Sequence, residues 1–211
     1  MKLAILDRDG TLNLPGDGYI TSPDEWIAQP GALEAVARLN HAGWHVVLAC
    51  NQPGLGRGLF DVKVLNAIHA KMYRQLAAVG GRIDAVFFCP HAPQETCRCR
   101  LPQPELLAQI CERYGVDAAQ VLVVGSSMAL LQAGAALGVR RLHLVQQLAQ
   151  QVGAASAAAQ GMGALANPVD GAPEPLPEVQ KHASLGALVE HLLQAETAAE
   201  AVPLPAHPAQ A

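Results

Sequence analysis

The sequence predicts an α/β fold in which a mainly parallel β-sheet is covered by helices on both faces. Short runs of apolar residues alternate with longer stretches in which apolar residues recur at helical spacing. The short runs are continuous rather than alternating, which is typical of strands buried on both faces. Repeated strand–helix units of this kind give parallel strands joined by right-handed crossovers.

The elements follow one another in a regular order along the chain. Strands are expected at residues 3–6, 44–50, 85–88, 121–124 and 142–145. One helix is expected to open at Pro30 and to end at Gly43. Another is expected after Asp61, whose carboxylate can accept from the free amides of a first helical turn. Further helices are expected at residues 105–114, around residues 130–137 and from Ser184.

The length of 211 residues is enough for one well-buried domain. That domain is expected over residues 1–195, with 146–180 forming a poorly ordered loop and the Ala/Pro-rich stretch 196–211 a disordered tail.

Charge and hydropathy exclude several classes of protein. The formal net charge of −4 gives no basic surface for nucleic acid. No stretch reaches the ~20 apolar residues needed to cross a membrane. No signal peptide is expected before the first strand, and three of the five cysteines crowd into one short loop rather than being spread as a disulfide framework. A cytoplasmic monomer acting on a small molecule is expected.

Four predicted strands end in residues that can form a site. Asp7, Asn51, Cys89 and Gly125 stand at or just beyond the carboxyl ends of their strands. In parallel α/β sheets, ligands bind in the crevice beyond those ends. We therefore expect a single site at this edge.

The motif Asp7-Arg8-Asp9-Gly10-Thr11 directly follows the first strand. One carboxylate could attack phosphorus while the other moves a proton to or from the leaving group. Gly10 lets the backbone bend close to a ligand, and the Thr11 hydroxyl can donate to phosphate. The alternative is a pair of solvated aspartates that merely ends a strand, but their position favours a site.

The sequence Cys89-x-His91 followed by Cys97-x-Cys99 provides three thiols and an imidazole within eleven residues. Zinc takes four such ligands tetrahedrally, and with every position filled by protein its role is structural. The alternative is a group of buried or free thiols beside an incidental histidine.

The aspartate motif resembles the nucleophile motif of the haloacid-dehalogenase superfamily. Together with the stretches around Asn51, Cys89 and Cys97, it resembles most closely the D-glycero-D-manno-heptose 1,7-bisphosphate phosphatases, which are related to histidinol-phosphate phosphatases. The resemblance implies a Rossmann-like haloacid-dehalogenase fold, magnesium dependence and an aspartyl-phosphate intermediate. It also implies zinc in the cysteine-rich loop.

The resemblance assigns roles by position. Asp7 would be the nucleophile and a magnesium ligand, and Asp9 the acid/base, with its backbone carbonyl on the metal. The expected substrate-binding positions are Thr11, Cys50, Asn51, Gln52, Arg57 and Arg100.

Four positions depart from the family pattern. Cys50 stands where the family has Thr or Ser, Leu101 where it has Lys, Ser126 where it has the magnesium-binding Asp, and Leu130 where it has a second acidic residue. Weakly held magnesium and impaired turnover of a phosphorylated sugar are therefore expected. The alternatives are a catalytically silent, zinc-stabilised relative that binds a sugar phosphate or a partner, and a histidinol-phosphate phosphatase.

Overall fold

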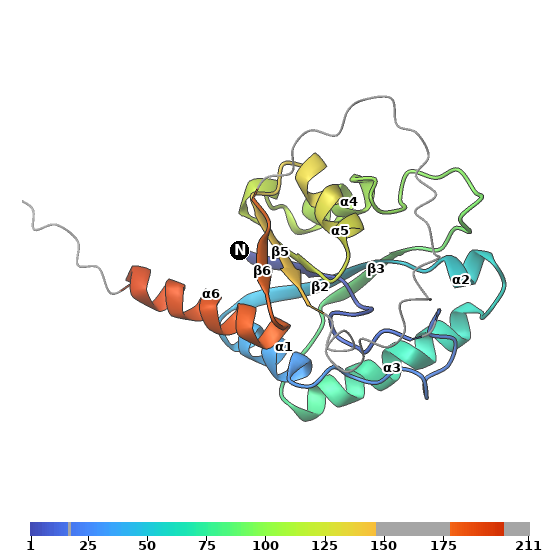
Figure 1. Cartoon of the computed structure of the whole chain (residues 1–211), viewed down its shortest axis with the longest axis horizontal. Coiled ribbons are helices and arrows are strands. Elements are labelled where there is room, and N and C mark those ends of the chain that lie inside the picture. The colour runs from blue at the N-terminus through green and yellow to red at the C-terminus, as the bar shows by residue number, and fades with distance from the viewer. Residues whose placement is uncertain (17, 147–177, 201–211) are drawn as a thin grey trace, which may run out of the picture.

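The computed structural model describes residues 1–16, 18–146 and 178–200. Its centre is a parallel six-stranded sheet in the order β3-β2-β1-β4-β5-β6 (Figure 1). The strands are β1 (Lys2–Leu6), β2 (Trp44–Asn51), β3 (Ala85–Cys89), β4 (Leu122–Gly125), β5 (Arg141–Val145) and β6 (Gln180–His182).

The strand β1 lies in the middle of the sheet, between β2 and β4. Its residue Ile5 is paired in register with Val47 on one side and Val123 on the other. All three side chains are fully buried, which is why these strands read as continuous apolar runs in the sequence.

Helices cover both faces of the sheet, as expected. The helices α1, α3 and α6 lie on one face, and α4 and α5 lie on the other (Figure 1). The helical segments are α1 (Ala32–His41), α2 (Pro53–Gly56), α3 (Val62–Ala78), α4 (Glu105–Tyr114), η1 (Ala118–Gln120), α5 (Met128–Ala136) and α6 (Leu185–Glu200).

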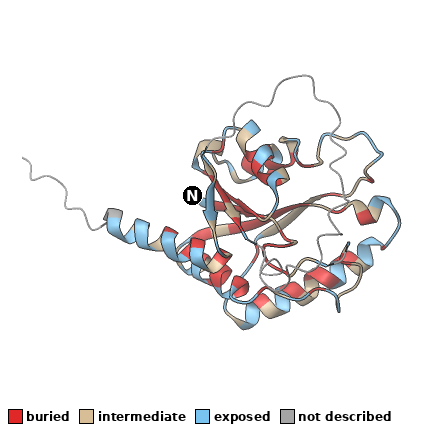
Figure 2. Ribbon diagram, in the orientation of Figure 1, coloured by how far each residue is buried: buried red, intermediate tan, exposed pale blue. Residues whose placement is uncertain are grey.

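Local capping matches the sequence at several helix ends. The Asp61 side chain accepts a hydrogen bond from the Val64 amide at 2.9 Å and so caps α3. Gly115 ends α4 in the left-handed conformation, with φ of 61°. Buried residues line the sheet and the inner faces of the helices, whereas the outer faces are exposed (Figure 2).

Two expectations for the C-terminal region need correction. The short edge strand β6 begins at Gln180, at the end of the expected loop 146–180, and pairs with β5 in parallel. The helix α6 continues to Glu200, so residues 196–200 are helical rather than part of a tail. The rest of the expected loop, 147–177, and of the tail, 201–211, lies outside the described residues. Among the described helices, none is both long and apolar enough to traverse a bilayer.

Candidate active site and metal-binding loop

The turn after β1 places the aspartate motif at the carboxyl edge of the sheet. The Asp7 amide donates to the Val124 carbonyl at 3.0 Å, so Asp7 still belongs to the ladder with β4. The chain then folds back, because the amides of Thr11, Leu12 and Asn13 all donate to the Arg8 carbonyl. Gly10 has φ of 79°, so its expected role in this bend is confirmed.

The Asp7 carboxylate is held from two sides. The Arg8 amide donates to Oδ1 at 2.9 Å, and the Ser127 hydroxyl donates to Oδ2 at 3.4 Å. Desolvation by the surrounding protein, reinforced by the negative charge of Asp9, raises the pKa of Asp7 to about 7. Positive charge at this edge would therefore stabilise the ionised form of Asp7.

The Asp9 carboxylate faces the guanidinium of Arg8. Nε donates to Oδ1 at 3.0 Å and Nη2 donates to Oδ2 at 2.9 Å, a two-pronged ion pair. The Asp9 side chain remains 39% exposed, whereas that of Arg8 is 1% exposed. Asp9 thus reaches solvent while its partner lies inside the protein.

Oxygen atoms that suit a hard cation gather where magnesium was expected. The Asp7 carboxylate and the Asp9 carbonyl lie at the same edge, and the Ser126 hydroxyl donates to that carbonyl at 3.0 Å. Magnesium often takes only one or two carboxylates and completes its shell with water and substrate phosphate. The residues therefore fit magnesium, but Ser126 adds a neutral hydroxyl and no charge.

Cys50 and Gln52 lie at and just beyond the carboxyl end of β2, and the Gln52 side-chain oxygen accepts from Arg8 Nη2 at 3.4 Å. Both are buried, and the Gln52 side-chain amide donates to the Cys50 sulfur at 3.5 Å. Burial is the main reason that the pKa of the Cys50 thiol rises to about 12, so this group stays protonated at neutral pH. The hydroxyl of Thr11 is also buried and has no protein partner among the described residues.

Asn51 holds the backbone of Leu101 in the structure. Its Nδ2 donates to the Leu101 carbonyl at 3.1 Å, and its Oδ1 accepts from the Leu101 amide at 3.0 Å. The side chains of Leu101 and Leu130 are buried in the cluster on the α4 and α5 face. These two positions contribute packing, and the role of Asn51 toward substrate stays a prediction.

The two arginines expected to face the substrate have different surroundings. Arg57 donates to the Tyr19 hydroxyl at 3.3 Å, and its guanidinium lies 5.6 Å from the centre of that ring. Arg100 donates to the carbonyls of Pro93 at 3.3 Å and Glu95 at 2.9 Å, and to that of Ala92. Arg100 is therefore tied into the cysteine-rich loop.

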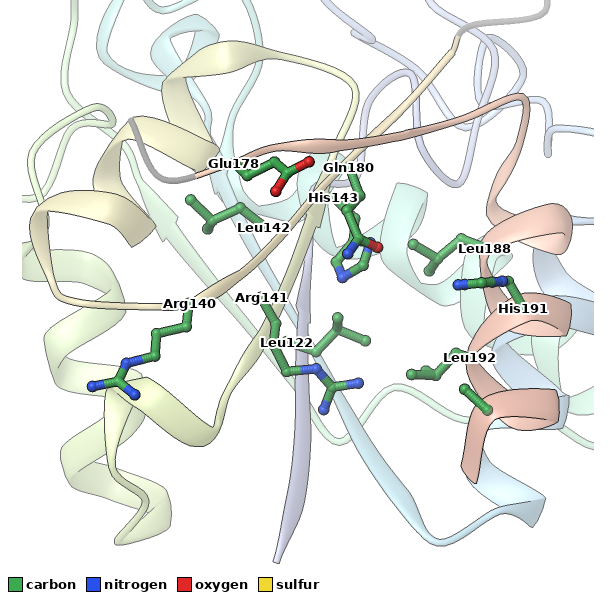
Figure 3. Close-up of a pocket in the computed structure, with 11 residues that line it drawn as sticks. Leu122, Arg140, Arg141, Leu142, His143, Glu178, Gln180, Leu188, His191 and Leu192 are labelled. Atoms are coloured by element: carbon green, nitrogen blue, oxygen red, sulfur yellow. The ribbon is translucent and has the colours of Figure 1, made fainter. Parts of the chain in front are cut away.

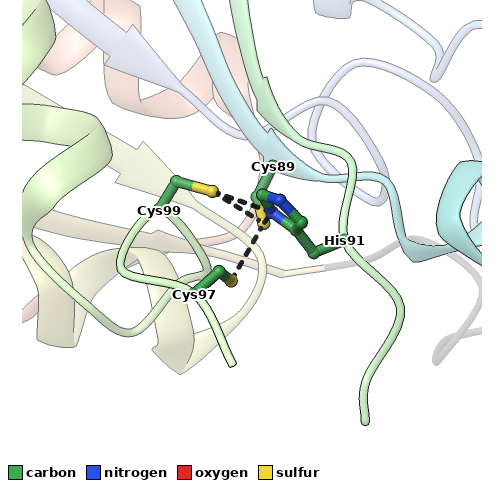
Figure 4. Close-up of side chains that lie close together, drawn as sticks. All are labelled: Cys89, His91, Cys97 and Cys99. Carbon is green, nitrogen blue, oxygen red and sulfur yellow. Dashed lines mark hydrogen bonds between the residues drawn. The ribbon is translucent and has the colours of Figure 1, made fainter. Parts of the chain in front are cut away.

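The four expected zinc ligands do converge (Figure 4). Cys89 Sγ lies 3.6 Å from Cys97 Sγ and 3.1 Å from Cys99 Sγ, and His91 Nδ1 is within 3.5 Å of two of the sulfurs. A tetrahedral zinc ion would hold sulfurs about 3.8 Å apart and sulfur and nitrogen about 3.6 Å apart. The set fits zinc once the Cys89 and Cys99 sulfurs move apart by about 0.7 Å, with smaller shifts of the other ligand atoms.

The cysteine-rich loop is joined to the segment that carries Arg57. The backbone amide of Gln52 donates to the Cys89 carbonyl at 2.8 Å, and that of Gly56 donates to the Pro90 carbonyl at 2.9 Å. A Cβ atom on Gly56 would lie 2.3 Å from the Ala92 nitrogen, so only glycine allows this approach. The cysteine-rich loop therefore helps to fix the position of the segment that carries Arg57.

Replacing Cys97 by Ser is expected to lower the zinc content from about one ion per chain to near zero, because the thiolate is the soft ligand that zinc requires. Since binding free energy of a structural zinc is folding free energy, we expect a loss of roughly 3 kcal/mol or more. That loss corresponds to a fall of about 6–12 °C in Tm. Cys111→Ala, at a helix position outside the cluster, is the control. Equal zinc content in the two variants would contradict the assignment.

His69 on α3 lies behind the active-site turn, 3.3 Å from Arg8 Nη1. Burial, and then the charge of Arg8, lowers the pKa of His69 to about 4. The unfolded chain takes up this proton near pH 6.5 and the folded chain only near pH 4, so folding is weakened as pH falls through that window.

Between pH 7 and pH 4.5, the free energy of unfolding is expected to fall by roughly 1–2 kcal/mol less in His69→Gln than in the wild type. Glutamine keeps an acceptor for Arg8 but does not titrate in this range. Urea unfolding of both proteins at the two pH values measures the difference, and other titrating groups cancel in the comparison. An identical pH dependence would show that His69 is not kept neutral by the fold.

A pocket of about 190 Å³ lies elsewhere, between the sheet and α6 (Figure 3). Its lining includes Leu122 and Arg141, the first residues of β4 and β5, and His191 of α6. Because it opens at the amino ends of these strands, it is separate from the site around Asp7.

Some residues of the site were not identified from the sequence. Arg8, Ser127 and Tyr19 contact expected site residues through hydrogen bonds that no spacing rule predicts. The burial of His69 could have been predicted, because it follows Ile68 on the apolar side of a helix whose stripe is regular.

Comparisons with known proteins agree with this geometry. The family model for haloacid dehalogenase-like hydrolases matches residues 5–138. D-glycero-beta-D-manno-heptose-1,7-bisphosphate 7-phosphatase from Bordetella bronchiseptica is 57% identical over 138 residues, which cover 65% of this chain and 77% of the relative. The enzyme of the same name from Pseudomonas aeruginosa is 47% identical over 136 residues, covering 64% of this chain and 76% of the relative.

Solved structures give the same result. The B. bronchiseptica D,D-heptose 1,7-bisphosphate phosphatase complexed with magnesium and phosphate superimposes with a TM-score of 0.76 at 46% identity, over 92% of this chain and 99% of that one. The Burkholderia thailandensis phosphatase superimposes with a TM-score of 0.62, also at 46% identity and with the same coverage. With a family model that spans the turn after β1, the cysteine-rich loop and β4, this chain belongs to the haloacid dehalogenase-like hydrolases.

Proposed function

We propose that the protein is a phosphomonoester hydrolase whose nucleophile is Asp7 and whose acid/base is Asp9. The observation that carries the proposal is the pair of carboxylates on one tight turn at the carboxyl edge of the sheet. Asp7 is fixed by the Arg8 amide, and Asp9 reaches solvent from a fixed ion pair. The two groups have the separate environments that nucleophilic and proton-transfer roles require.

The reaction has two steps. A carboxylate oxygen of Asp7 forms a bond to phosphorus as the bond to the substrate oxygen breaks, and Asp9, which is protonated when the substrate binds, donates its proton to that departing oxygen. Asp9 then takes a proton from water, which attacks the phosphorus of the aspartyl phosphate. Phosphate leaves, and Asp7 and Asp9 return to their initial states.

We further propose D,D-heptose 1,7-bisphosphate as the substrate. The support is the identity of 57% and 47% to two phosphatases named for that sugar. Thr11, Cys50, Asn51, Gln52, Arg57 and Arg100 are the proposed substrate-binding residues. Arg57 and Arg100 carry the positive charge that phosphate requires, and Leu101 contributes none.

Two metals belong to the proposal. Magnesium, held by the Asp7 carboxylate and the Asp9 carbonyl, would neutralise charge on the phosphoryl group. With Ser126 as a neutral neighbour we expect weak binding and slow turnover. Zinc, held by Cys89, His91, Cys97 and Cys99, would be structural. A cytoplasmic monomer completes the proposal.

A second candidate is a silent relative that binds a sugar phosphate without cleaving it. The observation that favours it is the pair of uncharged residues Leu101 and Ser126, because the site then has fewer groups to offset phosphate repulsion by Asp7 and Asp9. A histidinol-phosphate phosphatase shares the same motifs and is a third.

Phosphate release by purified, zinc-loaded protein distinguishes these candidates. Release from heptose 1,7-bisphosphate in millimolar magnesium, faster than from histidinol phosphate, supports the proposal. The reverse order identifies a histidinol-phosphate phosphatase. Absence of release from either ester, together with saturable binding of the sugar phosphate, identifies the silent relative.

A further inference from the structure

A buried arginine lies directly behind the proposed acid/base. Arg8 is 1% exposed, yet its guanidinium contacts both carboxylate oxygens of Asp9, at 3.0 and 2.9 Å. Its backbone amide also holds Asp7. We propose that Arg8 is a positioning residue that fixes the Asp9 carboxylate for proton transfer. This inference rests on the proposed phosphatase function.

The guanidinium has its own support inside the protein. Nη1 lies 3.3 Å from Nε2 of His69 on α3, and Nη2 donates to the Gln52 side-chain oxygen at 3.4 Å. His69 is buried and stays neutral near pH 7, so it can accept from Arg8 without repelling it. Arg8 therefore has partners from the turn after β1, from α3 and from the segment after β2, and its plane cannot rotate freely.

This arrangement constrains how Asp9 can work. Each carboxylate oxygen has two lone pairs, and the fork of Arg8 takes up one on each oxygen. The other lone pairs are not taken up by Arg8, and 39% of the Asp9 side chain is exposed. The carboxylate plane is thus fixed while a proton can still be exchanged on the open side.

Arginine suits this position better than lysine. Its planar guanidinium matches a carboxylate at two points, and it does not lose its proton in proteins. It therefore cannot compete with Asp9 as an acid. A lysine would supply the charge at one point only and would leave the carboxylate free to turn. Replacing Arg8 by lysine therefore keeps the positive charge but removes the two-point contact that orients the carboxylate.

The test is Arg8→Lys assayed on phosphate monoesters whose leaving groups range from a sugar alcohol to a nitrophenol. A sugar oxygen leaves only with a proton, whereas nitrophenolate leaves without one. If Arg8 orients Asp9, kcat on the sugar phosphate falls by about 10–100-fold with KM within threefold. Release of nitrophenolate in the first turnover stays close to the wild-type rate. The cleavage rate of the variant therefore depends more steeply on the leaving group than that of the wild type.

Arg82→Lys is the matched control, since the Arg82 side chain is 60% exposed and its guanidinium pairs with Asp84, just before the amino end of β3. An equal loss on all esters, or no loss, overturns the positioning role and leaves the phosphatase function intact. A wild type that cleaves no ester overturns the proposed function and this role with it.

Should Arg8→Lys fail to fold, His69→Leu provides the second variant. It removes the acceptor behind Nη1 but keeps the charge and the fork of Arg8. A smaller loss, about threefold, confined to sugar esters is expected. A loss in rate that is the same for sugar esters and nitrophenyl esters contradicts the role.

Discussion

Asp7→Asn is expected to lower phosphate release from heptose 1,7-bisphosphate by roughly 10⁴-fold or more, because removing the nucleophile of a covalent mechanism leaves only binding contributions. An amide is nearly isosteric with the carboxylate and can still accept from the Arg8 amide. The variant should fold as well as the wild type, since it removes a desolvated charge beside Asp9.

The measurement is phosphate release in millimolar magnesium, with enzyme at micromolar concentration so that slow turnover is visible. Asp24→Asn is the matched control, because Asp24 is an exposed carboxylate in the loop before α1. Brief incubation with ³²P-labelled substrate should also leave acid-stable, hydroxylamine-sensitive label on the wild type and none on Asp7→Asn. Release by Asp7→Asn at the wild-type rate would exclude Asp7 as the nucleophile.

The parts of the fold that the sequence predicts are those with a strong local pattern. The central strands bury both faces, so they appear as continuous apolar runs. Asp61 caps its helix as expected, and Glu105–Tyr114 is helical over the predicted residues. The four expected zinc ligands converge because they are close in sequence, and a short loop can bring them together.

The parts that the sequence does not predict depend on tertiary contacts. The strand Gln180–His182 has polar residues and only three positions, so pairing with β5 rather than hydropathy makes it a strand. Asn51 has the polarity of a binding residue, but its amide holds the backbone of Leu101. The ion pair between Arg8 and Asp9 is local in sequence, whereas the burial that gives it strength comes from α3.

Ser126→Asp is expected to increase the affinity for magnesium by about 10–100-fold and to raise turnover with it. At an effective dielectric near 20, one charge pair at 4 Å contributes about 4 kcal/mol. Repulsion from Asp7 and Asp9 offsets part of this, and a net gain of roughly 1.4–2.8 kcal/mol corresponds to the stated range. Ser126 donates to the Asp9 carbonyl, which a carboxylate cannot do, so the metal-free variant should be less stable.

The comparison that isolates charge is Ser126→Asn, which has the size of Asp without its negative charge. Electron paramagnetic resonance of Mn²⁺, used as a stand-in for magnesium, measures affinity without relying on activity. Magnesium should raise the Tm of Ser126→Asp more than that of the wild type or of Ser126→Asn, because the ion binds only the folded site. Equal Mn²⁺ affinity in the three proteins would mean that the uncharged Ser126 does not limit metal binding, and slow turnover would then have to arise from Cys50 or Leu101 instead.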